Sequence, residues 1–255
     1  MVSPVTGKWQ IAWITGASSG IGKAVALELA GAGVKVAASA RSVDALKALA
    51  TENPLIKAYP CDVTDSAAMA TAASQIAAEL GPIDLVILNA GTWFPVDLKN
   101  FDPAMFQKTF DVNFLGVVRG IAAVLPGMRE RRRGQIAIVA SVAGYRGLPK
   151  AGAYGPSKAA LINLAESLRP DLADLGITLS LVNPGFVATP MTAVNDFPMP
   201  FMIETNDAAR RIVKGLASGR FEVAFPWQLV SILKIAQVLP YWLYFWLLNR
   251  GVRRK

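Results

Sequence analysis

The sequence predicts an α/β fold, a doubly wound parallel sheet of about seven strands with helices on both faces. Three observations lead to this prediction. Short apolar runs alternate with segments of helical spacing along most of the 255 residues. The apolar runs are nearly continuous, as in strands that are buried on both faces. A glycine-rich stretch, residues 15–22, joins the first apolar run to the first helical segment.

The strict order of these segments indicates βαβ units with right-handed crossovers. The predicted strands are residues 9–14, 34–39, 55–59, 83–88, 135–140, 177–182 and 221–225. The predicted helices are residues 20–32, 43–51, 66–80, 103–128, 152–175 and 207–218. Since no linker or repeat divides the pattern, residues 1–225 are predicted to form one Rossmann-type domain, and residues 226–255 an apolar and basic extension.

The composition limits the chemistry that the chain can perform. With no histidine, every triad built on histidine is excluded, a zinc site is disfavoured, and we expect no metal site. Acid–base chemistry must then use Tyr, Lys, Asp, Glu or Cys. The single cysteine, Cys61, excludes an internal disulfide, and residues 2–14 lack the pattern of a secretory signal, so we expect a cytoplasmic location.

The glycine-rich stretch has the strand–turn–helix context of a phosphate-binding corner. Its glycines allow a tight turn and a close approach to pyrophosphate, and the helix N-terminus offers free N–H groups. The spacing is Gly-x-x-x-Gly-x-Gly rather than the more familiar Gly-x-Gly-x-x-Gly. The residues expected to form this site are Gly16, Ser18, Ser19, Gly20, Ile21 and Gly22.

Polar or glycine residues also follow the other predicted strands, at the edge where doubly wound sheets bind ligands. They are Arg41 and Ser42, Asp62 and Val63, Asn89-Ala90-Gly91, Ser141, and Asn183-Pro184-Gly185. Strands often end in turn residues, so these residues alone do not show a binding site. The residues with acid–base chemistry that are predicted to lie at the same edge make a site the better interpretation.

Tyr154 and Lys158 are one helical turn apart, so both side chains face the same way. Such a pair alone is commonly a surface pair. Here Ser141 ends a strand 13 residues before Tyr154, which allows a loop back to the helix. An ammonium beside a phenol favours the phenolate, and a nearby hydroxyl can bond a substrate oxygen. The three residues therefore predict an acid–base unit for a carbonyl oxygen.

In combination, these residues resemble the short-chain dehydrogenase/reductase family, over nearly the whole chain up to about Phe225. The residues that match the family's motifs are the cofactor turn from Thr15 to Gly22, the adenine-ring Asp62 with Val63, the central-strand Asn89-Ala90-Gly91, the tetrad Asn113, Ser141, Tyr154 and Lys158, and the nicotinamide loop with Pro184, Gly185, Val187 and Thr189. The resemblance implies a nicotinamide-dependent oxidoreductase.

The resemblance also implies a role for each member of the tetrad. Tyr154 is the general acid in reduction and the base in oxidation. Lys158 lowers the Tyr154 pKa and binds the nicotinamide ribose together with Tyr154. Ser141 positions the substrate oxygen, and Asn113 anchors a water in the proton relay through the helix backbone. Ala140 departs from the second serine that many relatives have at this place.

The end of the second predicted strand favours NADP(H) as the cofactor. A carboxylate there would bind the ribose hydroxyls and repel a 2′-phosphate, but no acid occurs before Asp44. We expect Ser39, Arg41 and Ser42 around the 2′-phosphate, with the Arg41 guanidinium pairing with it. Alternatively, Arg41 is a solvated turn residue.

Residues 186–203 are rich in Met, Phe and Pro, which make an adaptable apolar loop over the substrate. The expected substrate contacts are Trp93, Val142, Tyr145, Phe186 and Met191. They favour a small lipophilic alcohol or carbonyl compound, although ordinary loop packing is an alternative.

Residues 227–255 combine two apolar segments, separated by Pro240, with a basic end. A transmembrane helix, a dimer-interface or lid helix, and an interfacial anchor are all compatible with this pattern. We favour the anchor, peripheral on the cytoplasmic face of a membrane, because Trp and Tyr are dense and no acid follows Glu222.

The alternative to an enzyme is a cofactor-binding sensor or scaffold with little turnover, against which the intact tetrad argues. The net charge of +8 does not indicate nucleic-acid binding, because the basic residues form no reading motif. The resemblance further implies a homodimer or homotetramer through the two long helices that carry Asn113 and Tyr154.

Overall fold

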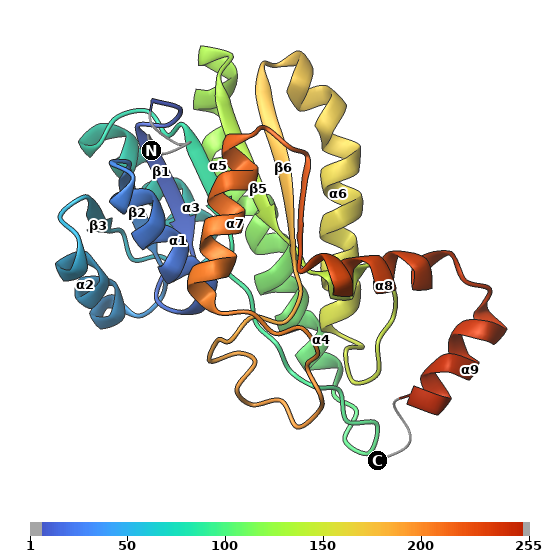
Figure 1. The fold of residues 1–255 in the computed structure, drawn as a ribbon. Coiled ribbons are helices and arrows are strands. Elements are labelled where there is room, and N and C mark those ends of the chain that lie inside the picture. Colours follow the sequence, from blue (N-terminus) through green and yellow to red (C-terminus); the bar gives the residue numbers. More distant parts are fainter. Residues whose placement is uncertain (1–6, 252–255) are drawn as a thin grey trace.

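A computed structural model describes residues 7–251 as a seven-stranded sheet flanked by helices (Figure 1). The strand order is β3-β2-β1-β4-β5-β6-β7, and all neighbouring strands are parallel. The strands are β1 (Ile11–Thr15), β2 (Lys35–Ser39), β3 (Ile56–Ala58), β4 (Leu85–Leu88), β5 (Gly134–Val139), β6 (Ile177–Pro184) and β7 (Glu222–Phe225). Each was predicted, with ends correct to within two residues.

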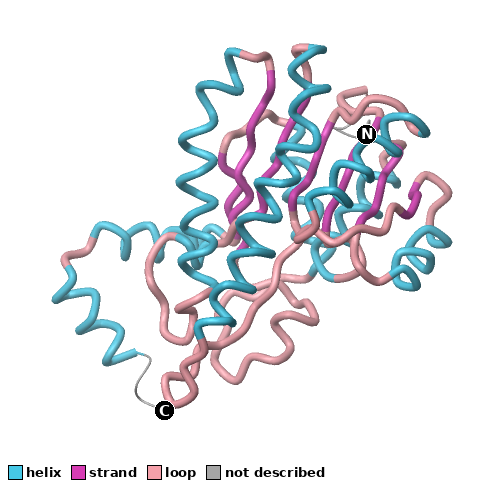
Figure 2. Tube along the Cα trace, turned by 180° about the vertical axis from the view of Figure 1, so that it is seen from behind, coloured by secondary structure: helices cyan, strands magenta, loops and turns pink. Residues whose placement is uncertain are grey.

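The helices lie on both faces of the sheet, as the sequence predicts (Figure 2). They are α1 (Gly20–Gly31), α2 (Val43–Glu52), α3 (Ser66–Glu79), α4 (Pro103–Phe110), α5 (Gly116–Arg131), α6 (Tyr154–Asp174), α7 (Thr205–Ala217), α8 (Trp227–Val238) and α9 (Tyr241–Gly251). Alternate residues of β1 enter the two cores: Ile14 packs with α1 and α7, and Trp13 with α3 and α5.

The long helix predicted at residues 103–128 contains a change in winding. A π-helical turn, Asp111–Leu115, joins α4 to α5 without a break. Asn113 is the buried residue of this turn. Such turns occur frequently at functional sites, and hydrophobic periodicity could not reveal this one.

The chain reverses its direction of strand addition between β1 and β4, which are neighbours in the sheet. Thr15 pairs with Leu88 at the carboxyl ends of these two strands. The glycine turn and Asn89 therefore leave the sheet side by side. This is the topological switch point at which open α/β sheets bind their ligands.

The C-terminal segment forms two helices, α8 and α9, that meet at a corner, and α9 lies away from the sheet (Figure 1). With 12 and 11 residues, α8 and α9 are each shorter than the roughly 20 residues that a membrane-spanning helix needs. Within residues 7–251, the single helical stretch long and apolar enough to cross a membrane is Pro103–Arg131. Ile121, Val124 and Met128 of that stretch are buried in the core.

Candidate active site

A cavity of about 460 Å³ lies at the β1/β4 switch point. Most of the residues predicted to hold a cofactor line it, from the glycine turn to the loop of residues 186–203, which we call the lid. They are Gly16, Ser18, Ser19, Gly20, Ile21, Arg41, Ser42, Asp62, Val63, Asn89, Ala90, Gly91 and Thr189. Met191, predicted as a substrate contact, is also in its wall.

The glycine turn has a backbone that requires glycine. Gly16 and Gly20 have φ values of +68° and +55°. A Cβ atom on Gly16 would lie 2.8 Å from the Ala90 Cα, and one on Gly22 would lie 2.3 Å from the Gly16 carbonyl oxygen. Gly22 is absent from the cavity wall, and its role in the described chain is the packing of α1 against the turn.

Asn89 holds the turn against the central strand. Its Nδ2 donates to the carbonyl oxygens of Thr15 and Gly16, at 3.0 and 3.2 Å. Its backbone N–H donates to Thr15 Oγ1 at 3.0 Å. The Asn89-Ala90-Gly91 motif thus supports the turn as well as lining the cavity.

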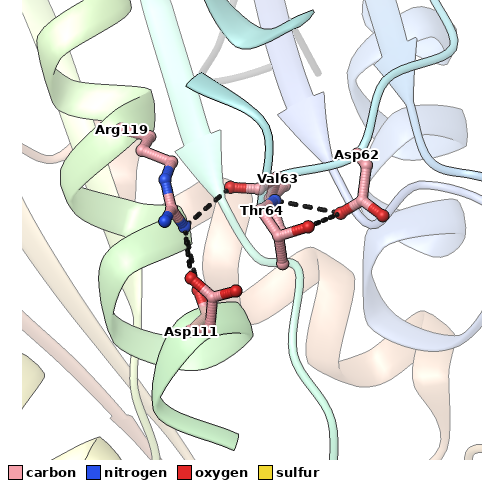
Figure 3. Close-up of polar contacts among 5 residues, drawn as sticks. All are labelled: Asp62, Val63, Thr64, Asp111 and Arg119. Carbon is pink, nitrogen blue, oxygen red and sulfur yellow. Dashed lines mark hydrogen bonds and ion pairs between the residues drawn. The ribbon is translucent and has the colours of Figure 1, made fainter. Parts of the chain in front are cut away.

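The Asp62 end of the cavity is ordered by two polar groups (Figure 3). One Asp62 carboxylate oxygen accepts bonds from the backbone N–H and the hydroxyl of Thr64, both at 2.9 Å. Arg119 reaches from α5 to the Val63 carbonyl oxygen at 3.4 Å and pairs with Asp111 at 2.8 Å. Burial opposes ionisation of Asp62, but the Thr64 bonds and the charges of Arg41 and Arg119 outweigh it and lower its pKa.

The prediction for Ser39 is wrong. Its side chain is fully buried beneath the end of β2 rather than facing the cavity. Its hydroxyl accepts a bond from Trp13 Nε1 at 2.9 Å and donates to the Tyr59 carbonyl oxygen at 2.6 Å. Side chains alternate along a strand, so the last residue of β2 points into the core while Arg41 and Ser42 are exposed beyond it.

Asn113 bridges the π-turn to two neighbouring segments. Its Oδ1 accepts from the Thr92 backbone N–H at 2.7 Å, and its Nδ2 donates to the Thr92 carbonyl oxygen and Ser157 Oγ, both at 3.0 Å. A buried amide with three such bonds is a rigid anchor. It fixes the segment after β4 against the helix that carries Tyr154.

Tyr154, Lys158 and Ser141 come together as predicted. The Lys158 Nζ lies 5.5 Å from the centre of the Tyr154 ring and donates to the Val139 carbonyl oxygen at 2.9 Å. The Ser141 hydroxyl donates to the Pro184 carbonyl oxygen at 3.3 Å. Burial lowers the Lys158 pKa to about 8.

Lys158 was expected to lower the Tyr154 pKa, but burial dominates in this structure. The Tyr154 pKa is raised by desolvation, and the group that opposes this shift is the Ser141 hydroxyl. The ammonium of Lys158 is directed to the Val139 carbonyl oxygen instead. The phenol is therefore held as a proton donor.

Residues predicted to contact substrate divide into two groups. Trp93 lies edge-on to Tyr154, with ring centres 5.3 Å apart, and its Nε1 donates to Asn195 Oδ1 of the lid at 2.9 Å. Tyr145 instead donates its hydroxyl to Glu222. Tyr145 and Val142 are both buried against α8, where the half-buried Phe186 also packs, so the predictions that Tyr145 and Val142 face substrate are wrong.

The nicotinamide loop is only partly exposed to the cavity. Thr189 lines it, and a Cβ on Gly20 would lie 3.2 Å from the Thr189 side chain. Pro184, Gly185 and Val187 lie outside its wall, and Val187 pairs with Ile203 in an isolated bridge. Lys108 was missed: it lines the cavity with Phe94, and its Nζ lies 5.4 Å from that ring centre. A lysine in a helical segment gave no signal of this.

The model of the short chain dehydrogenase family matches residues 10–197. This chain belongs to that family. An uncharacterized oxidoreductase of Myxococcus xanthus is 41% identical over 236 residues, which cover 91% of this chain and 93% of the relative. The 2-dehydro-3-deoxy-L-rhamnonate dehydrogenase (NAD(+)) of a Sphingomonas species is 38% identical, with 70% of this chain and 72% of the relative covered.

Solved structures of short-chain dehydrogenases have the same fold. One from Streptomyces avermitilis superposes with a TM-score of 0.81 at 25% identity, covering 96% of this chain and 98% of its own. One from Burkholderia phymatum, in complex with NAD, has a TM-score of 0.82 at 24% identity, covering 90% and 93%.

The residues present fit a nicotinamide dinucleotide. Ser19, at the start of α1, makes no side-chain capping bond, and no acid occupies the first turn, so the amides of that turn face the cavity without a carboxylate. A side chain on Gly16 would collide with the Ala90 backbone. The cavity joins this phosphate end to Asp62 on one side and to Gly91 on the other. The family's nicotinamide chemistry thus has a place in this chain.

Proposed function

We propose that this oxidoreductase is NADP(H)-dependent and interconverts a secondary or aldehyde-level alcohol and a carbonyl compound on a lipophilic substrate. The observation that carries the proposal is the juxtaposition of Tyr154 with Ser141 and Lys158. The three side chains do not line the cavity themselves, but a Cβ atom on Gly91 of its wall would lie 3.7 Å from the Lys158 Nζ. Bound nicotinamide supplies or accepts the hydride. The protein supplies the proton and the orientation.

The residues divide that work between them. Tyr154, whose pKa is raised by burial, is protonated at neutral pH and donates its proton to the carbonyl oxygen in reduction. Ser141 Oγ hydrogen-bonds the same oxygen. Lys158 holds positive charge beside the ring and stabilises the phenolate that remains. Asn113 keeps the segment after β4 in register with α6 through its Thr92 and Ser157 bonds.

The preference for NADP(H) is supported by Arg41. It is exposed at the cavity edge, next to Ser42 and close enough to Asp62 to lower that carboxyl's pKa. A guanidinium in this place suits a 2′-phosphate. The Sphingomonas relative is named for NAD(+), so cofactor preference in this chain rests on its own residues.

The substrate class is supported by the apolar groups around Tyr154. Trp93 covers one edge of the phenol, and Phe94 and Met191 line the adjoining cavity. A small lipophilic alcohol or carbonyl compound suits these surfaces. We further propose that the protein is cytoplasmic and peripheral on a membrane. We also propose a homodimer or homotetramer formed through α5 and α6, because Leu115 at the end of the π-turn and Val118 of α5 are exposed.

Screening NADPH oxidation against aldehydes, ketosteroids, retinoids and 3-oxoacyl compounds tests the proposal. With the best substrate, Tyr154→Phe should lower kcat roughly 10²–10⁴-fold because the proton donor is lost. Tyr59→Phe is the control, since its hydroxyl bonds Glu79 away from the site. Unchanged activity in Tyr154→Phe would favour the sensor or scaffold alternative.

A further inference from the structure

The helices α8 and α9 present an apolar surface that the rest of the described chain leaves uncovered. Val238 is 80% exposed and Trp242 is 73% exposed. We name this surface the outer face; it consists of Trp227, Ile232, Ile235, Val238, Trp242, Phe245 and Trp246. Both views show α9 standing away from the sheet (Figures 1 and 2). Large apolar side chains exposed this densely on two consecutive helices indicate an interaction site.

The outer face is distinct from the face by which α8 joins the fold. Leu229 and Leu233 are buried against Val142 and Tyr145. A Cβ on Gly185 would lie 2.8 Å from the Leu229 side chain, so α8 lies directly on the β6 end. Ile232, Ile235 and Val238 recur every third residue on the opposite side and are exposed. The helix is therefore apolar on two sides, and residues 7–251 cover only one of them.

Specific contacts fix α9 at its angle to α8. Arg146 donates to the carbonyl oxygens of Gln237 and Leu239, at 3.0 and 3.3 Å, where α8 ends. Its guanidinium also lies 4.6 Å from the ring centres of Tyr241 and Tyr244. The buried Tyr244 donates its hydroxyl to the Gly147 carbonyl oxygen. These contacts of Arg146 and Tyr244 fix the orientation of α9, so its remaining aromatic side chains stay exposed.

The chemistry of this surface identifies its partner. Trp242, Trp246 and Arg250 follow one another at intervals of four residues, and the Arg250 guanidinium lies 4.1 Å from the Trp246 ring centre. The sequence contains no acid after Glu222 but five basic residues, of which Lys234 pairs with Glu222. Tryptophan and tyrosine with arginine suit the headgroup level of a bilayer, and the sign of the charge suits anionic lipid.

We infer that the outer face of α8 and α9 docks the protein in the interface of an anionic lipid bilayer. The helices lie along the surface, since neither is long enough to cross. The same α8 packs on its inner side against Val142 and Tyr145, just after Ser141. Docking would therefore bring the segment after Ser141 towards the lipid surface. We also infer that a lipophilic substrate reaches the site from the bilayer, and this part of the inference rests on the proposed function.

Vesicle flotation of the full chain tests the inference. One set of vesicles contains phosphatidylcholine alone, and the other contains a third phosphatidylglycerol. The Trp242→Ser/Trp246→Ser double variant should bind at least about tenfold more weakly. Arg250→Glu should weaken binding to the anionic vesicles roughly fivefold or more. Lys47→Glu on α2, at the opposite end of the sheet from α8 in Figure 1, should bind as wild type does.

Two measurements on the same samples separate the alternatives. Sedimentation velocity detects self-association, and a wild-type protein that does not float but forms an oligomer lost in the double variant would assign the outer face to a second copy. Equal flotation of the wild type and the double variant overturns the inference. NADPH oxidation with a water-soluble substrate should be unchanged in all three variants. A wild-type enzyme that is active but does not float overturns the membrane docking and leaves the proposed function standing. A protein that floats but shows no turnover overturns the proposed function and leaves the docking standing.

Discussion

The hydroxyl of Tyr145 donates a hydrogen bond to the carboxylate of Glu222, which joins the turn after Ser141 to the last strand of the sheet. The same carboxylate accepts from Asn183 Nδ2 at 2.9 Å and pairs with Lys234 of α8. Asn183 immediately precedes Pro184, whose carbonyl oxygen accepts the Ser141 hydroxyl. Glu222 therefore stabilises the surroundings of Ser141 without lining the cavity.

Replacing Glu222 by Gln should lower the free energy of unfolding by about 1–3 kcal/mol at neutral pH, because three donors lose a charged acceptor. Burial opposes ionisation of Glu222, but bonds from Lys234, Tyr145 and Asn183 lower its pKa below 4.5. Its stabilisation is thus present above that value and is lost as pH falls through the lowered pKa.

Urea unfolding at pH 7 and at about pH 3 measures this effect. The difference between wild type and variant should shrink at the lower pH. Glu166→Gln, on the exposed side of α6, is the matched control and should show little change at either pH. A constant difference across pH would show that the Glu222 charge does not contribute.

The fold could be predicted from sequence because its signals are local. Continuous apolar runs and glycine turns depend on neighbouring residues, and the sheet followed from their alternation. Asn113, Ser141, Tyr154 and Lys158 could be placed at one site because the family motif fixes their order on elements whose ends meet at one sheet edge. The residues beside them were harder to assign.

The errors come from orientation and from distant partners. Ser39 follows an apolar strand and looks like an end residue, but the pleat turns it inward to Trp13. Tyr145 lies close to Ser141 in sequence, yet Glu222, 77 residues away, determines where it points. No local pattern encodes such a pairing. The sequence of α8 likewise does not show which of its apolar residues are buried, because that depends on the contacts of Leu229 and Leu233 with Val142 and Tyr145.

Substitution of Ser39 by Ala separates a core role from a cofactor role. The variant leaves Trp13 Nε1 buried without its acceptor, which should cost about 1–3 kcal/mol of unfolding free energy. The KM for NADPH should not change, because Ser39 is absent from the cavity wall. Thermal unfolding and steady-state kinetics on the same preparation test both points. A raised KM with unchanged stability would restore Ser39 to the phosphate site.

Substitution of Arg41 by Asp tests the proposed cofactor preference. The carboxylate would repel a 2′-phosphate and could bond ribose hydroxyls instead. The ratio of kcat/KM for NADPH to that for NADH should fall at least about tenfold, corresponding to roughly 1.4 kcal/mol. Lys47→Asp makes the same change of charge on α2, away from the cavity wall, and should leave the ratio almost unchanged. If the two variants shift the ratio equally, Arg41 acts only through net charge.

The buried charge of Lys158 lowers the stability of the fold, although the proposed function requires that charge beside Tyr154. Lys158 is buried, and its pKa falls from 10.5 to about 8 because the charged form is poorly solvated. That difference corresponds to about 3 kcal/mol against folding at neutral pH. Lys158→Met should therefore raise the free energy of unfolding by about 1–3 kcal/mol at pH 7, although it gives up the bond to the Val139 carbonyl oxygen.

The sign of the pH dependence follows from the same two values. Between pH 8 and 10.5 the unfolded state binds more protons than the folded state, so wild-type stability gains relative to the variant as pH rises. Urea unfolding of both proteins at pH 7 and at about pH 10 isolates this contribution, since other groups titrate in both. Lys47→Met, at an exposed site, should show no such trend.

Turnover by Lys158→Met should be lost while its stability increases, because the ammonium that stabilises the Tyr154 phenolate is gone. A variant less stable than wild type at pH 7 would show instead that the Val139 bond outweighs the cost of burying the charge.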